Sequence, residues 1–110
     1  MCGRFTNKMT WQEIHDLYDI TNEAFRPNLR PNYNIAPTQI VPVVRLAADG
    51  HELALMRWGF EESWAKSSII NATAEKVATS GVFKTSFEQR RCLIPADGFY
   101  EWKKGALEWE

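Results

Sequence analysis

The sequence has little of what several common classes of protein require. Its 110 residues include only two cysteines, Cys2 and Cys92, and two histidines, His15 and His51. Neither histidine has a cysteine or a carboxylate at ligand spacing, so a zinc site is not indicated and we expect no metal or other cofactor. In a reducing compartment the two cysteines would stay free thiols rather than form a disulfide.

Net charge and long apolar runs are also lacking. The formal net charge is -1, so no global field favours DNA, RNA or an anionic membrane, and any polyanion site has to be local. No apolar run is long enough to span a bilayer, and the charged start lacks the apolar segment of a signal peptide. We therefore expect a cytoplasmic protein, nucleoid-associated if bacterial, with no membrane partner.

The sequence contains enough apolar residues for the core of one folded domain. Its patterns predict one clear helix and several strands. The content is 45% apolar and 13% aromatic. Thr10 and Glu13 form a capping box at the start of a predicted helix over residues 10–20. Residues 39–46 and 51–58 predict a hairpin, with Pro42 marking an edge or a bulge.

The remaining segments are predicted with less regular structure. Residues 21–38 carry three prolines and indicate an ordered loop. Residues 68–72 predict a short strand, 74–80 a short helix, and 91–104 two strands broken around Pro95 and Gly98. The architecture is α+β or mainly β. The last strand has no following partner, so either the chain is cut short or the partner comes from elsewhere.

Cys2 is the first candidate for chemistry. Once the initiator methionine is removed, its α-amine and thiol sit on adjacent carbons, with ordinary pKa values of about 7.7–8.0 and about 8.5. An amine attacks an aldehyde to give an imine, and the thiol can close onto that imine as a thiazolidine. The alternative is that a cysteine at position 2 has no role, because most thiols are inert.

Glu101 and Asn71 are the next candidates. Glu101 stands among aromatic residues, so we expect it to be partly desolvated and suited to act as a general acid; the alternative is a surface glutamate on an edge strand. Asn71 lies where a strand hands over to a helix, and its simplest role there is an N-cap. An amide at this place could also hold a sugar hydroxyl or a carbonyl.

Basic and aromatic side chains give a further, weaker signal. Cations beside exposed rings are what single-stranded nucleic acid needs, because phosphates require neutralisation and bases require stacking. The plain alternative is a solvated basic edge with buried tryptophans. The residues concerned are Arg4, Lys8, Arg90, Arg91, Trp58 and Trp64.

Taken together, five motifs are more specific than any one of them. In order along the chain they read MCGRF, NYNIAPTQ, RWGF with a downstream SWAK, INATAE, and RRCLIPADGFYEWK. This series resembles the SRAP family (SOS-response-associated peptidase domains) over essentially all 110 residues. The resemblance implies a compact α+β domain with mixed, mainly antiparallel β-sheets and a short N-terminal helix. Residues 1–110 would be the N-terminal portion of a single SRAP domain, truncated relative to the family.

The resemblance also implies an activity and a partner. Family members cross-link to abasic sites in single-stranded DNA and shield them: the amine of Cys2 would attack the ring-opened aldehyde and its thiol would close the thiazolidine. Glu101 would serve as acid and base, and Asn71 would position the sugar and the Cys2 end. Arg4 would contact a phosphate, and Pro37 and Trp64 would meet bases near the lesion. The family name also records a proposed removal of the protein's own leading residue.

Three departures from the family pattern keep two other functions open. The catalytic histidine of an H-x-R-M-P motif is missing, Thr73 replaces an arginine expected to grip phosphate, and Glu61 and Glu62 stand where the DNA face should be. These favour an impaired remnant that binds single-stranded DNA weakly or not at all. A Cys-dependent peptidase is the other alternative, and it would need His15 or His51 as the partner of the thiol.

Overall fold

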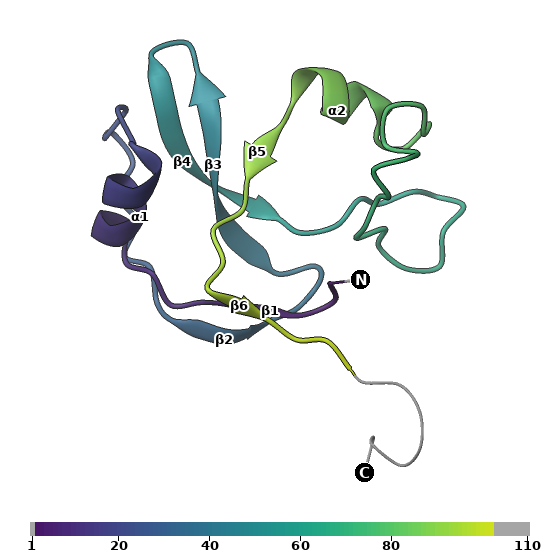
Figure 1. Ribbon diagram of the computed structural model, residues 1–110, viewed down its shortest axis with the longest axis horizontal. Helices are drawn as coiled ribbons and strands as arrows, with labels where there is room; N and C mark the ends of the chain where they lie inside the picture. The colour runs from purple at the N-terminus through teal and green to yellow at the C-terminus, as the bar shows by residue number, and fades with distance from the viewer. Residues whose placement is uncertain (1, 103–110) are drawn as a thin grey trace.

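Two small antiparallel sheets and two helices make up the chain (Figure 1). The structure, a computed structural model, describes residues 2–102. One sheet has the strand order β2-β1-β6 and the other β4-β3-β5. The strands are β1 (Phe5–Asn7), β2 (Asn32–Ile35), β3 (Ile40–Ala47), β4 (Gly50–Arg57), β5 (Cys92–Leu93) and β6 (Gly98–Phe99). The helices are α1 (Trp11–Tyr18) and α2 (Lys84–Gln89). The predicted α+β class with mainly antiparallel sheets is confirmed.

The N-terminal helix and the hairpin form as the sequence predicts. Thr10 caps α1, its side chain accepting from the Glu13 backbone N–H while the Glu13 side chain accepts from the Thr10 N–H. β3 and β4 pair without a bulge from Ile40 opposite Arg57 to Ala47 opposite Gly50. Of the two alternatives predicted for Pro42, the edge is confirmed and the bulge is not: β5 pairs only with Val44 and Arg45, so β3 has one strand neighbour at the proline.

The third quarter of the chain differs from the prediction. Residues 68–72 do not form a strand, and only an isolated bridge joins Ile69 to Phe60. Residues 74–79 form turns rather than a helix, and the helix begins later, at Lys84. Threonine and valine near these turns are poor helix formers, and Gly81 ends the segment before a helix can propagate.

The core consists of two clusters of buried side chains, one on each face of the hairpin. One contains Phe5, Ile35, Val41 and Val43, and the other contains Ile14, Ile20, Val44 and Leu53. Adjacent β3 residues Val43 and Val44 serve different clusters, because successive side chains of a strand point to opposite faces. The first cluster joins the two sheets, and α1 packs on the second.

The last described strand finds its partner at the start of the chain. β6 pairs antiparallel with β1, with Phe5 opposite Phe99 and Thr6 opposite Gly98 (Figure 1). The unpartnered strand of the sequence analysis is therefore paired with β1. This pairing brings the segment that follows Cys2 beside the segment that leads to Glu101.

Candidate functional site

Cys2 lies just before β1 and is half-buried. It packs against the cluster of Phe5, Ile35, Val41 and Val43, together with Trp58. Its thiol lies 3.7 Å from the backbone carbonyl oxygen of Arg4. The apolar contacts hold Cys2 in place, and the residue remains partly exposed to solvent.

The Asn71 side chain holds the Cys2 backbone. Its Nδ2 donates a hydrogen bond of 2.9 Å to the Cys2 carbonyl oxygen, across 69 positions of sequence, in a partly buried place. The N-cap interpretation of Asn71 is wrong, because turns and not a helix follow it. The amide instead fixes the position of the chain's start, since a partly buried donor without this acceptor would lose a bond worth about 1 kcal/mol.

Glu101 lies two residues beyond β6, on the segment that pairs with β1. The Tyr100 N–H donates to the Arg4 carbonyl oxygen at 2.9 Å, which continues the contact between these two segments beyond Phe5 and Phe99. Glu101 is the residue after Tyr100, and Cys2 lies two residues before Arg4.

The expected desolvation of Glu101 is wrong, because the residue is exposed. β6 is a two-residue strand at the edge of its sheet. The neighbouring aromatic side chains do not enclose the carboxylate, since Phe99 is 67% and Trp102 69% exposed themselves.

Arg4 is oriented by an amide rather than by a carboxylate. Its Nη1 donates to Asn34 Oδ1 at 2.9 Å. Arg4 and Asn34 line a cavity of about 580 Å³ together with Gly3, Tyr100 and Trp102. Because a neutral amide fixes the guanidinium without neutralising it, Arg4 keeps its positive charge available to an anion in this cavity.

An aspartate ties β6 to β1. Asp97 accepts from the Thr6 hydroxyl at 2.6 Å and from the Lys8 backbone N–H at 2.7 Å. The Asp97 N–H in turn donates to the Thr6 carbonyl at 3.0 Å. The Lys8 N–H first, and then the Thr6 hydroxyl, lower the pKa of Asp97 below its ordinary value. We call these three residues the Asp97 clasp; it fixes the segment on which Glu101 stands.

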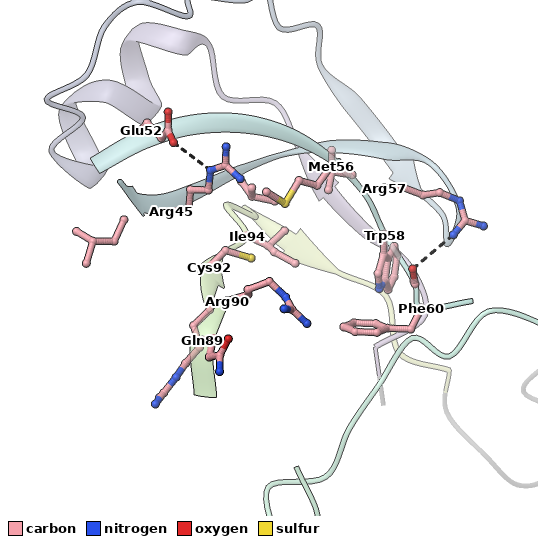
Figure 2. A pocket seen from close by; sticks show the side chains of 15 residues that line it. Arg45, Glu52, Met56, Arg57, Trp58, Phe60, Gln89, Arg90, Cys92 and Ile94 are labelled. Carbon is pink, nitrogen blue, oxygen red and sulfur yellow. Dashed lines mark hydrogen bonds and ion pairs between the residues drawn. The ribbon is translucent and has the colours of Figure 1, made fainter. Parts of the chain in front are cut away.

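Arg90 and Arg91 line a different cavity, whose wall includes residues of the β4-β3-β5 sheet and Gln89 at the end of α2; Figure 2 shows Arg90 and Gln89 beside Cys92 there. Arg90 Nη2 donates to Ser86 Oγ at 3.1 Å, and Arg91 lies 4.4 Å from the centre of the Phe87 ring. This cavity measures about 570 Å³ and has a largely apolar wall that includes Val43, Met56 and Trp58. The two arginines do not line the cavity beside Cys2, and their contact with DNA stays a prediction.

The other predicted base contacts lie on loops. Pro37 is half-buried in the turn after β2, where the next residue, Thr38, donates its N–H to the Trp58 carbonyl at 2.8 Å. Trp64 is 71% exposed on the loop after β4. Both are available to a ligand, and neither is shown to meet one.

The carboxylate of Glu61 does not stand uncompensated on this loop. It accepts from Arg57 at the end of β4 and from the Ser68 hydroxyl at 2.9 Å. The Ser68 hydroxyl and then Arg57 lower its pKa, so Glu61 is ionised and paired. The repulsion of phosphates expected from this residue is therefore reduced by its own counter-ion.

Both histidines are engaged away from Cys2. His15 lies between Asp16, at 3.0 Å, and Glu23, at 3.6 Å, on the surface of α1. His51 Nδ1 lies 3.1 Å from the Asp19 carbonyl oxygen. A peptidase that uses either imidazole to activate the Cys2 thiol is not supported by this arrangement.

The sequence analysis did not identify two residues of the candidate site. Asn34 and Asp97 both lie inside motifs quoted above, but asparagine in a loop and Asp-Gly in a turn have ordinary structural explanations. Only the fold shows that Asn34 faces Arg4 and that Asp97 reaches Thr6.

Comparison with known proteins identifies the family of the chain. The model of the family described as SOS response associated peptidase (SRAP) matches residues 1–109. The chain belongs to the SRAP family. The chain is 37% identical over 109 residues to the Bacillus subtilis abasic site processing protein YoaM, covering 94% of this chain and 48% of YoaM. It is 34% identical over 108 residues to the Escherichia coli abasic site processing protein YedK, covering 94% and 49%.

A vertebrate relative is matched over a smaller share. The Xenopus tropicalis abasic site processing protein HMCES is 33% identical over 92 residues, which cover 68% of this SRAP chain and 28% of HMCES. The chain spans about half the length of its bacterial relatives YoaM and YedK.

Residues 2–102 contain neither a metal-binding cluster nor a helix that could span a membrane. No three metal-binding side chains (His, Cys, Asp or Glu) gather in this part of the SRAP chain to form an ion site. Neither of its helices has the length and apolar character needed to cross a membrane.

Proposed function

We propose that this SRAP chain processes abasic sites in single-stranded DNA by forming a covalent link through Cys2. The relatives YoaM and YedK are named abasic site processing proteins. One observation carries the proposal: Asn71, distant in sequence, donates its side-chain hydrogen bond to the Cys2 carbonyl. A bond of this kind at the extreme start of a chain supports a function for the terminus, since termini are otherwise poorly ordered.

The chemistry follows from two groups of Cys2. The α-amine, freed by removal of residue 1, adds to the C1′ aldehyde of the ring-opened abasic sugar and loses water to give an imine. The thiol then adds across the C=N bond, forming the S–C bond and returning a proton to nitrogen. No leaving group or oxidant is needed for the second step, so the thiazolidine product retains every atom of the imine.

The other residues have supporting roles in this scheme. Glu101, the residue after Tyr100, whose N–H donates to the Arg4 carbonyl, is proposed to exchange protons during ring opening and imine formation. Arg4 neutralises a phosphate in its cavity, where Tyr100 and Trp102 offer ring surfaces to a base. Pro37, Trp64, Arg90 and Arg91 are proposed to contact the strand further from Cys2.

A denaturing gel tests the proposal. The chain, shown by intact mass to begin at Cys2, is incubated with single-stranded DNA that carries one abasic site. A heat-stable shifted band is expected, and it should disappear with Cys2→Ala and when residue 1 is retained. Retention of residue 1 is the sharper control, because it blocks the amine in a peptide bond and leaves the thiol unchanged.

Each other outcome has a definite meaning. Absence of a band from protein that begins at Cys2 would overturn the proposal for this chain and favour an impaired remnant. A band that persists when the amine is blocked would show that the thiol alone reacts, contrary to thiazolidine formation.

A further inference from the structure

A second cavity borders the Cys2 site on the side of Asn71. It measures about 550 Å³ and is lined by Asn71, Ala72, Thr73, Lys76, Thr79, Ser80 and Phe83. Asn71 thus belongs to this cavity and also donates to the Cys2 carbonyl oxygen. The cavity containing Arg4 is lined by Gly3, the residue that follows Cys2. Cys2 is therefore connected to two cavities, to one through Gly3 and to the other through Asn71, and each has a cation in its wall.

Two consecutive turns build the cavity wall. The N–H groups of Lys76 and Val77 donate to the Thr73 carbonyl, at 3.2 and 3.0 Å. The N–H groups of Thr79 and Ser80 donate to the Lys76 carbonyl, at 3.1 and 2.8 Å. Because the chain winds in this way, Lys76 lies one turn after Thr73 and lines the same cavity.

The wall is positively charged and contains no acid among the described residues that form it. Lys76 is exposed, and it takes part in none of the ion pairs found among residues 2–102. The hydroxyl groups of Thr73 and Ser80 line the same cavity, and the Ser80 hydroxyl, which accepts from the Val82 N–H, keeps its proton for donation. The Thr79 hydroxyl instead donates to the Lys76 carbonyl at 3.4 Å. An ammonium group with hydroxyl donors and without a carboxylate matches a phosphate oxygen, which only accepts hydrogen bonds.

Phe83 contributes an aromatic ring to the wall of this cavity. The ring packs edge-to-face on Phe60, with ring centres 4.9 Å apart. Because this contact restricts the ring, a base that stacks on it has little side-chain motion to freeze. A cation, hydroxyl groups and an aromatic ring in one cavity match the phosphate and the base of a nucleotide.

We propose that Lys76 binds a backbone phosphate of the single-stranded DNA next to the abasic site, in the cavity that contains Asn71 and is separate from the cavity of Arg4. The inference rests on the proposed function for the identity of the ligand. Lys76 supplies the positive charge that the neutral Thr73 lacks, so each of the two cavities connected to Cys2 offers one cation to the strand.

Salt-dependent binding of DNA tests the role of Lys76 without any covalent chemistry. Fluorescence anisotropy is followed with a labelled, unmodified single-stranded oligothymidine over a range of salt concentrations. One phosphate contact contributes about 0.7 to the slope of log K against log salt for a single strand. Lys76→Gln should lower the slope by about 0.7 and weaken binding about fivefold at about 0.1 M salt.

Two variants serve as controls. Lys76→Arg should keep the slope, because the charge is retained. Arg30→Gln removes the same charge from an exposed residue that lines neither cavity beside Cys2, and it should leave the slope unchanged. An equal fall in slope for Arg30→Gln and Lys76→Gln would overturn the inference, as would an unchanged slope for Lys76→Gln or the absence of salt-dependent binding by the parent chain.

The outcome is distinguishable from that of the proposed function. The oligothymidine carries no aldehyde, so the slope reports phosphate contacts alone, whereas the abasic-site gel reports the reaction at Cys2. A normal slope loss without a cross-link would refute the covalent proposal and leave the role of Lys76 standing.

Discussion

Asp97→Asn tests the importance of the Asp97 clasp for the whole site. The asparagine of the variant has the size of the native side chain but one acceptor oxygen instead of two. Asp97 accepts from Thr6 at 2.6 Å and from Lys8 at 2.7 Å, so the variant loses one of the two acceptors and the negative charge that strengthens both bonds. The clasp joins the segment after Cys2 to the segment before Glu101, and its loss should loosen both.

The magnitude follows from the kind of bond. Hydrogen bonds to an ionised carboxylate contribute about 1.5–3 kcal/mol where they are shielded from water. Asp97 is exposed, so solvent reduces this contribution, and the loss is comparable to that of a side-chain helix cap, about 1 kcal/mol. For a domain near this size the melting temperature should fall by roughly 4–8 °C.

The pH dependence separates the charge from the shape of the side chain. The Lys8 N–H and the Thr6 hydroxyl lower the pKa of Asp97 in the folded state. Its contribution to stability is therefore complete above the unfolded value, about 3.9, and is lost as the pH falls through the lower folded value. Thermal melts of the parent chain and the variant should differ at pH 7 and converge below about pH 4.

A difference in melting temperature that stays constant from pH 7 to pH 3, or that grows on acidification, would refute this reasoning. Thr6→Val provides the matched control. It removes one donor to Asp97 without changing the charge of the protein, so it should lower stability at neutral pH and shift the titration of Asp97 upward.

Three further predictions concern other parts of the chain. Asn71→Asp replaces the donor to a backbone carbonyl by a carboxylate and should lower the free energy of unfolding in urea by about 1–3 kcal/mol, with partial recovery once the carboxylate is protonated. Gly50→Ala should cost about 1–3 kcal/mol in the same assay, because φ is +122° and an added Cβ would lie 1.8 Å from Thr21 Oγ1; a neutral result would contradict the turn geometry. NMR titration of His15 should give a pKa above 6.5, raised chiefly by its hydrogen bond to Asp16, so its stabilising contribution is complete below the unfolded pKa and is lost as the pH rises through the folded value.

The parts of the fold that sequence predicts are those with strong local signals. The capping box of Thr10 and Glu13 and the alternation of the hairpin give α1, β3 and β4 directly. Residues 68–80 carry mixed signals. The apolar run at their start predicts a strand, but the only β-pairing found there is the isolated bridge between Phe60 and Ile69. Local propensity does not decide such a segment; its tertiary contacts do.

The candidate site shows the same division. The motifs identify Cys2, Asn71 and Glu101 as chemically interesting residues, but they do not show that Asn71 reaches the Cys2 carbonyl or that Glu101 is exposed. These relations depend on strand register and on contacts between residues far apart in sequence. The orientation of Arg4 by Asn34 is of the same kind and could not be read from spacing.

The pairing of β1 with β6 has a consequence for how the protein is made. Phe5 and Phe99 are neighbours in the sheet, so the ribosome must release nearly a hundred residues before the first strand can meet its last partner. Contacts of such long sequence separation form slowly, because the closure entropy of the intervening chain has to be overcome first. During synthesis the segment that follows Cys2 therefore waits for β6, and this side of the candidate site forms only after residue 99 has been released.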